Sequence, residues 1–296
     1  MPKKNNIVFI CENCGETTIN WMGKCPSCNS WNTLKPFNEP EENKINVKNI
    51  NKNSSVDKAL LTSIKKIKTF DKARISTEIE ELNGVLGGGI VSGSVILIGG
   101  EPGIGKSTLL LQVASNIAKK EKVFYFTGEE SLEQIKLRAD RLNIIDSDFL
   151  ISSESNADNI INTLLEEKPK LAIIDSIQTV YSPSTNSIAG SPAQIKNCAW
   201  ALMQTAKLKN ITIFLVGHIT KEGTIAGPKI LEHIVDCVLY FEGDDKGIYR
   251  ILRAVKNRYG AVDEVGIFEM TEKGLAEVKD ASRVFTKGIN ESIFSG

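Results

Sequence analysis

The chain has 296 residues, of which 41% are hydrophobic and 24% are charged, which is typical of one full α/β domain with a smaller additional module. Lys and Arg together equal Asp and Glu together at 36 each, so the overall charge excludes a globally basic nucleic-acid-binding protein. No apolar run is long enough to span a membrane, and the N-terminus lacks a signal-peptide core. We therefore expect a cytoplasmic protein with no membrane partner.

Four of the six cysteines lie near the N-terminus, in two Cys-x-x-Cys pairs separated by ten residues. They are Cys11, Cys14, Cys25 and Cys28. Four thiolates at this spacing can surround one ion tetrahedrally, which predicts a structural Zn²⁺ site with no position open for water. Iron–sulfur ligation and two disulfides are the alternatives, and the reducing compartment expected for this chain disfavours the disulfides. Cys198 and Cys237 stand alone in apolar surroundings, which indicates core positions.

The composition changes along the chain and divides it into segments. Residues 1–37 form the cysteine-rich module, and residues 38–68, rich in Asn, Lys, Glu and Ser, are typical of a flexible basic linker. Between residues 44 and 74, nine Lys or Arg are opposed by only two acids, Asp57 and Asp71. A lysine-rich linker is usually just solvated, although this segment could add electrostatic affinity for nucleic acid.

Strand and helix patterns alternate from residue 69 onward. Short apolar strands are expected at 94–98, 123–126, 149–151, 171–174, 211–216 and 237–241. Helical spacing is found at 108–118, 131–142, 156–167 and 192–208. This alternation predicts an α/β fold with a mostly parallel central sheet covered by helices.

The stretch IGGEPGIGKST, residues 98–108, matches the phosphate-binding pattern G-x-x-x-x-G-K-[ST] between an expected strand and an expected helix. Its backbone N–H groups are expected to wrap the phosphates of ATP, while Lys106 reaches the β- and γ-phosphates and Ser107 binds Mg²⁺. The expected ATP-binding residues are Gly100, Glu101, Pro102, Gly103, Ile104, Gly105, Lys106, Ser107 and Thr108.

Carboxylates follow two other expected strands, at the edge where ligands bind in open α/β sheets. Asp175 follows the strand at 171–174 and is expected to organise Mg²⁺, with a surface aspartate as the alternative. Glu129 and Glu130 follow the strand at 123–126, and one of them could polarise the attacking water. Either could instead favour the N-terminus of the next helix, and the residues alone leave the choice open.

Six stretches resemble the RadA/Sms family of bacterial DNA-repair ATPases. They are CENCGETTINWMGKCPSCNSWNT, GEPGIGKSTLLLQ, YFTGEES, LAIIDSIQT, GHITKEGTIAGPKILEH and KNRYG, and the match runs from about residue 8 to 285. The resemblance implies a four-cysteine zinc finger, a RecA-like P-loop ATPase domain at 69–285, and residues 286–296 as the start of a further domain or a tail. It also implies that Glu129 is the catalytic glutamate and that His218 lies where it can sense the γ-phosphate.

The segment KNRYG, residues 256–260, resembles a five-residue signature of that family that usually has Phe at its fourth position, where Tyr259 keeps the aromatic ring. Lys256 and Arg258 are two residues apart in an extended segment, so they share a face and could stabilise charge on a phosphate. The resemblance implies that they serve the ATP of a neighbouring subunit. A solvated pair on an edge strand is the alternative.

The resemblance further implies a homo-oligomeric ring, a hexamer, that binds single-stranded and branched DNA and drives branch migration beside the recombinase RecA. Polar segments at 181–194 and 220–229 could project to the ring centre, where Lys221 and Lys229 would meet DNA phosphates. Family members usually continue into a domain that resembles the Lon protease. We expect this chain to lack that domain, which would weaken its ring.

Two other functions share parts of this pattern. A KaiC-like ATP-switched signalling protein would keep the core without DNA motor activity. A non-catalytic module would use its zinc finger to recruit a partner and ATP only to stabilise its fold. ATP hydrolysis that DNA stimulates separates the motor from both.

Overall fold

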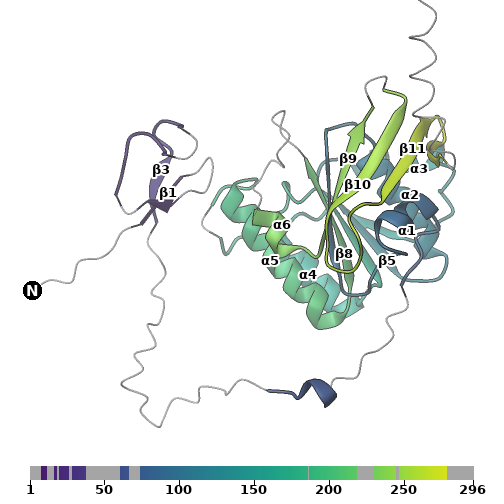
Figure 1. Cartoon of the computed structure of the whole chain (residues 1–296), viewed down its shortest axis with the longest axis horizontal. Coiled ribbons are helices and arrows are strands. Elements are labelled where there is room, and N and C mark those ends of the chain that lie inside the picture. The colour runs from purple at the N-terminus through teal and green to yellow at the C-terminus, as the bar shows by residue number, and fades with distance from the viewer. Residues whose placement is uncertain are drawn as a thin grey trace, which may run out of the picture. The chain divides into compact units, whose positions relative to one another are not determined.

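A computed structural model describes residues 8–11, 17–18, 20–26, 29–37, 61–66, 74–185, 187–218, 230–244 and 247–278. The chain separates into two compact units, Met1–Lys72 and Ala73–Gly296 (Figure 1).

The described part of the first unit contains a small antiparallel sheet. Strand β1 (Val8–Cys11) lies between β2 (Thr17–Thr18) and β3 (Leu34–Phe37). Cys11, Cys25 and Leu34 form its buried cluster, with Phe9 packed against them. A cluster of this size supplies too little burial to hold a fold by itself, which is the setting in which small modules use a metal. A single 3-10 turn, η1 (Ile64–Lys66), follows further along the chain.

The second unit is built on a nine-stranded sheet in the order β12-β11-β10-β9-β4-β8-β7-β5-β6 (Figure 1). The strands from β9 to β6 run parallel to one another. They are β9 (Cys237–Gly243), β4 (Val95–Gly100), β8 (Thr212–His218), β7 (Leu171–Asp175), β5 (Val123–Thr127) and β6 (Leu150–Ser152). Strands β10 (Tyr249–Asn257), β11 (Val265–Thr271) and β12 (Gly274–Glu277) extend the sheet in antiparallel fashion. The predicted fold class is confirmed, and these last three strands are an addition to the expected ones.

Helices cover both faces of this sheet (Figure 1). One layer contains α1 (Glu80–Val85), α2 (Lys106–Ala118) and α3 (Leu132–Arg141), and the other contains α4 (Ala157–Glu167), α5 (Pro192–Lys209) and α6 (Ile230–Ile234). In β4, Ile96 and Ile98 pack toward the first layer, whereas Val95 and Leu97 pack toward the second. Because both faces are covered, the parallel strands are continuous apolar runs rather than alternating ones.

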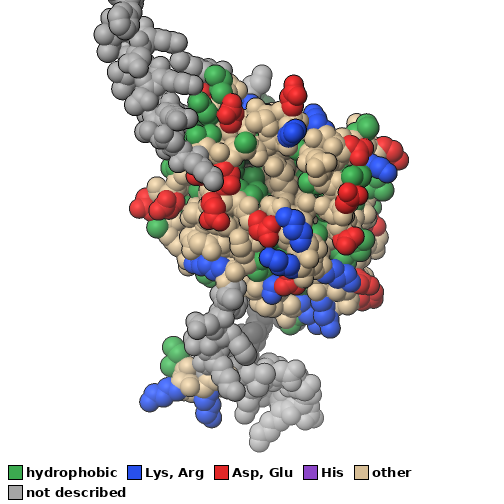
Figure 2. Space-filling view, turned by 90° about the vertical axis from the view of Figure 1, so that its right-hand side faces the viewer, with side chains coloured by type: hydrophobic (Ala, Val, Ile, Leu, Met, Phe, Trp, Pro, Cys, Tyr) green, Lys and Arg blue, Asp and Glu red, His purple; other side chains and the backbone are tan. Residues whose placement is uncertain are grey.

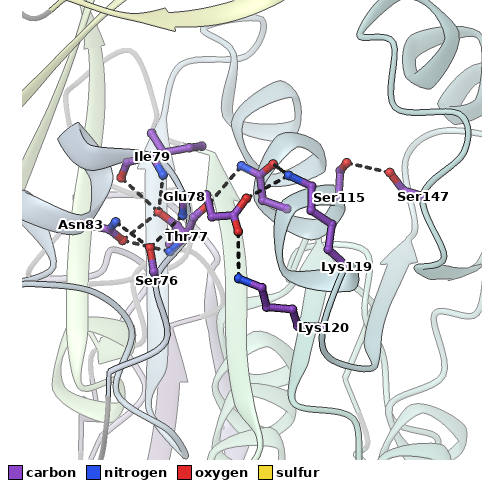
Figure 3. Close-up of polar contacts among 10 residues, drawn as sticks. Ser76, Thr77, Glu78, Ile79, Asn83, Ser115, Lys119, Lys120 and Ser147 are labelled. Atoms are coloured by element: carbon purple, nitrogen blue, oxygen red, sulfur yellow. Dashed lines mark hydrogen bonds and ion pairs between the residues drawn. The ribbon is translucent and has the colours of Figure 1, made fainter.

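The segment before α1 is tied to α1 and to the far end of α2 (Figure 3). The Thr77 hydroxyl donates to Asn83 Oδ1 over 2.8 Å, and Asn116 Nδ2 donates to the Thr77 carbonyl over 3.1 Å. Glu78 adds an ion pair with Lys119 at 2.8 Å, but both side chains are more than a third exposed, so this pair contributes little. The hydrogen bond from Asn116 to Thr77 therefore fixes α2 at the end opposite to the glycine-rich loop.

On the face of the second unit that Figure 2 shows, acidic and basic side chains are interspersed. Among the helices of the described ranges, none combines the length and the apolar character needed to cross a bilayer.

Candidate nucleotide-binding site

The glycine-rich loop lies between a strand and a helix. Strand β4 ends at Gly100 and α2 begins at Lys106, so residues 101–105 form the loop at the carboxyl edge of the parallel strands. Gly105 has a φ of 119°, in the left-handed region that favours glycine. A Cβ on Gly100 would lie 2.5 Å from the carbonyl oxygen of Phe241, so only glycine allows this close approach. The motif therefore has the strand, loop and helix geometry that phosphate binding requires.

Lys106 is 4% exposed. Its Nζ donates to the carbonyl oxygens of Gly100 over 2.8 Å and of Glu101 over 2.9 Å. Burial lowers the pKa of Lys106 to about 8, and the carboxylates of Asp175 and Glu129 oppose this shift. An anion beside Nζ would restore the charged form, so the loop fits a polyphosphate.

Asp175 is the last residue of β7 and is 6% exposed. The hydroxyl of Tyr125 donates to Asp175 Oδ2 over 2.5 Å. Burial, followed by the charge of Asp175, raises the pKa of Tyr125, so the phenol keeps its proton and holds the carboxylate in place. Asp175 also acts electrostatically on Lys106, which puts it in the same site as the loop. A fixed, buried carboxylate beside a phosphate loop fits Mg²⁺.

Glu129 and Glu130 point to different partners. Glu129 accepts a hydrogen bond from the Ser176 hydroxyl, and its Oε1 lies 2.7 Å from His218 Nε2. The bond from His218 is the largest influence on Glu129 and lowers its pKa, so the group stays a carboxylate. Glu130 instead forms an ion pair with Arg138 of α3 at 2.5 Å. The first glutamate therefore belongs with Lys106 at the phosphate site, and the second is paired with the last turn of α3.

His218 is the last residue of β8, the strand between β4 and β7. It pairs with Gly100 of β4, so His218 lies beside the first residue of the phosphate-binding motif. Residues 219–229 follow it directly, and the two lysines expected to meet DNA, Lys221 and Lys229, lie outside the described residues.

Lys256 and Arg258 lie near the amino ends of the parallel strands, whereas the phosphate loop lies at their carboxyl ends. Lys256 pairs with Val238, which pairs with Leu97, three residues before the end of β4. At about 3.3 Å per residue, Lys256 is displaced by roughly 10 Å along the strands from the start of its own phosphate loop. Its Nζ donates to carbonyls at the end of α6, and Arg258 Nη1 donates to Asp236 Oδ1 over 3.3 Å. The two cations are thus held by residues 232–236, at the end of α6 and the start of β9, which we call the anchoring corner. This corner is separate from the subunit's own phosphate site.

The turn that follows β10 is packed closely against the start of the second unit. A Cβ on Gly260 would lie 3.1 Å from the Cα of Gly87, and Arg74 Nη2 donates to the Tyr259 carbonyl over 2.6 Å. Strand β10 lies between β9 and β11, so it is not an edge strand, and Arg258 follows the end of β10 with 53% of its side chain exposed. The final glycine of the KNRYG segment is explained by this backbone contact.

A cavity of about 460 Å³ adjoins the phosphate loop and was not predicted from the sequence. It is lined by Thr108, Arg141, Met270, Thr271, Glu272 and Gly274. A Cβ on Gly105 would lie 2.9 Å from the Met270 methyl group, so the cavity and the loop share a wall. No motif marks these residues, because only the pairing of β11 with β12 brings them beside α2.

In the N-terminal module, Cys11 and Cys25 are each 1% exposed and pack in one cluster. Cys11 Sγ lies 3.1 Å from the Thr33 hydroxyl oxygen. The other two expected ligands, Cys14 and Cys28, lie outside the described residues. Two buried sulfur donors in so small a cluster fit a structural zinc ion.

A glycine-rich loop and a buried strand-end carboxylate on a mostly parallel sheet define an α/β P-loop nucleotide-binding protein. Comparison with protein families agrees: residues 62–224 match the AAA domain, and residues 9–36 match the rubredoxin metal binding domain. Since the first match covers more than half of the chain, the chain belongs to the AAA domain family. These matches imply ATP with Mg²⁺ in the second unit and zinc in the first.

Sequence relatives agree with the resemblance to the RadA/Sms family. The chain is 49% identical over 283 residues to the DNA repair protein RadA of Listeria monocytogenes, covering 95% of this chain and 61% of that protein. It is 48% identical over 290 residues to RadA of Bacillus subtilis, with 95% and 62% covered. The predicted resemblance is thus confirmed, and the chain spans about three fifths of the length of these relatives.

Among solved structures, a KaiC-like protein from Pyrococcus horikoshii superposes with a TM-score of 0.56 at 18% identity, covering 70% of this chain and 99% of that one. At this identity the likeness shows the fold alone.

Proposed function

We propose that the chain is a DNA-dependent ATPase of recombinational DNA repair. The hydrolytic part is supported by Glu129, a carboxylate that is held by His218 and Ser176 and interacts electrostatically with Lys106 of the phosphate loop. A binding-only loop does not need a charged base at this position. The DNA repair part is supported by the RadA relatives, whose identity to this chain extends over 95% of it.

Each residue of the site has a distinct proposed role. Lys106 and the N–H groups of the loop bind the β- and γ-phosphates. Ser107 and Asp175 hold Mg²⁺, which when bound neutralises charge that develops on the phosphates. Glu129 polarises the attacking water, and His218 keeps Glu129 ionised and oriented while it responds to the γ-phosphate.

The cavity beside Thr108 is the proposed place for the adenine base. Met270 offers an apolar surface, and Arg141 offers a guanidinium plane that can stack on the base.

Lys256 and Arg258 are proposed to complete the ATP site of a neighbouring subunit. Their anchoring corner lies away from the phosphate loop of the same chain, so a head-to-tail contact between copies is needed to bring the two together. A closed arrangement of such contacts is a ring, which we propose to be a hexamer, and hydrolysis then depends on assembly.

The proposed ligands of the ring are single-stranded and branched DNA, with branch migration beside RecA as the outcome. The loop that follows Tyr181 ends at Ser191, which caps α5. This loop and Lys221 and Lys229 are the proposed contacts with DNA phosphates. A cytoplasmic location suits this role.

The test is ATP turnover with Mg²⁺, with and without single-stranded oligo-dT, for the wild type, Lys106→Ala and Lys256→Ala. We expect DNA to raise the rate and each substitution to abolish it. Mixing the two variants should restore turnover, because one supplies the phosphate loop and the other supplies the cations. Turnover that ignores DNA and survives the loss of Lys256 would refute the motor and favour an ATP-switched signalling protein.

A further inference from the structure

Asp236 is a buried carboxylate at the corner between α6 and β9, and it is 1% exposed. Its Oδ1 accepts a hydrogen bond from Arg258 Nη1 over 3.3 Å, and its carbonyl accepts one from the Arg258 N–H over 3.0 Å. Its Oδ2 accepts from the Val95 N–H over 2.9 Å and from Lys207 Nζ. One side chain thus touches the first residue of β4 and the second cation of the KNRYG segment.

The charge of Asp236 is matched to these partners. Burial by itself would raise its pKa, but the bonds from Lys207 and from the Val95 N–H outweigh burial and bring the pKa below its usual range. The carboxylate is therefore ionised and needs cations beside it. Its partner Arg258 has 53% of its side chain exposed, so the guanidinium is fixed at one end and presented to solvent at the other. That is the arrangement expected of a cation that acts on another molecule.

Lys256 depends on the same corner. Its Nζ donates to the carbonyl of Glu232 in α6 and to the carbonyl of Val235, the residue before Asp236. Burial and then the charge of Arg258 lower the pKa of Lys256, whereas Asp236 is the largest influence that raises it. Two cations this close repel each other, and the anion of Asp236 compensates for that repulsion.

We infer that Asp236 is the positioning residue for Lys256 and Arg258, the pair proposed to act on a neighbouring subunit's ATP. Through the Val95 N–H it also fixes this pair to β4, whose opposite end is Gly100 of the same subunit's phosphate loop. A strand embedded in a sheet is stiff, so the geometry of the pair is set by the strand that carries the loop. This inference rests on the proposed role of the pair in the neighbouring site.

The test uses the full chain with Asp236→Asn, which keeps the size of the side chain and removes its charge. The matched control is Asp263→Asn, which removes an exposed carboxylate five residues beyond Arg258. The readouts are the Kd of a fluorescent ATP analogue, turnover with oligo-dT, and the melting temperature. Misplacing a catalytic group by about 1 Å costs on the order of 100-fold in rate, so we expect a loss of that size in kcat for Asp236→Asn. Its Kd for the analogue should stay within about twofold, since its own loop is intact. Asp263→Asn should match the wild type in all three readouts.

Mixing subunits separates positioning from a structural role. Asp236→Asn subunits keep a phosphate loop, and Lys106→Ala subunits keep correctly placed cations, so their mixture should turn over ATP faster than either variant alone. If Asp236→Asn fails to fold, Asp236→Glu keeps the charge and moves the carboxylate by one methylene, so the same mixtures then test its position.

The outcomes distinguish this inference from the proposed function. If Lys256→Ala with Lys106→Ala regains turnover but Asp236→Asn with Lys106→Ala does not, Asp236 acts on its own subunit and the inference is overturned. Wild-type turnover by Asp236→Asn overturns it as well. If neither mixture regains turnover, the proposed action of Lys256 between subunits fails, and the inference fails with it.

Discussion

The pKa of Lys106 predicts that ATP affinity depends on pH in the alkaline range. The free site holds this lysine with a pKa of about 8 because burial disfavours its charge. Bound phosphates favour the charged form, so the pKa in the complex rises toward or above its ordinary value and binding takes up a proton. As pH rises above 8, more of the free protein carries neutral lysine, and the Kd for ATP therefore increases. For one such group, the Kd should rise about twofold between pH 7 and 8 and about eightfold between pH 8.5 and 9.5.

The assay is a titration with a fluorescent ATP analogue at each pH, with calorimetry in two buffers of different ionisation enthalpy to count the protons taken up. Lys106→Arg is the matched control, because a guanidinium stays charged throughout this range. Its affinity, although weaker, should not change with pH. A Kd for the wild type that is flat from pH 7 to 9.5, or a slope that persists in Lys106→Arg, would refute the reasoning.

Three further predictions test other parts of the chain. Glu129→Gln should lower kcat by about 10² to 10⁴-fold with little change in ATP binding. Glu130→Gln should retain most of the wild-type turnover, because Glu130 is paired with Arg138 of α3, and equal losses in the two variants would contradict this assignment. Gly260→Ala should lower the free energy of unfolding by about 1 to 3 kcal/mol in a denaturant titration, since its Cβ would press on the Gly87 backbone, and an unchanged midpoint would show that the turn adapts. Zinc removal by a chelator, or Cys25→Ser, should unfold the N-terminal module and leave the melting of the core unchanged, as expected for two separate units; a shared loss of both transitions would argue against that independence.

Local spacing was enough to predict the phosphate loop and the expected zinc ligands. A loop that wraps phosphate is made by consecutive residues, so Gly100, Gly105 and Lys106 could be identified without knowing their neighbours in space. The alternation of apolar runs likewise predicted the parallel strands, because a strand covered on both faces is apolar at every position. The antiparallel strands β10, β11 and β12 are partly exposed, and their weaker pattern did not distinguish them.

The tertiary structure decided what depends on residues far apart in the sequence. The two adjacent glutamates have the same chemistry and the same preceding strand, and only His218 and Arg138, on other elements, separate Glu129 from Glu130. The cavity beside Thr108 exists because β11 and β12 return to α2 across more than a hundred residues. No sequence pattern distinguishes Asp236 from other aspartates that precede a strand. Its contacts arise in the sheet, where the Val95 N–H donates to Oδ2 and Arg258 Nη1 donates to Oδ1. The groups proposed to bind phosphate could be predicted from the sequence alone, because they are neighbours along the chain. The groups proposed to orient them could not, because those meet only through strand order and register.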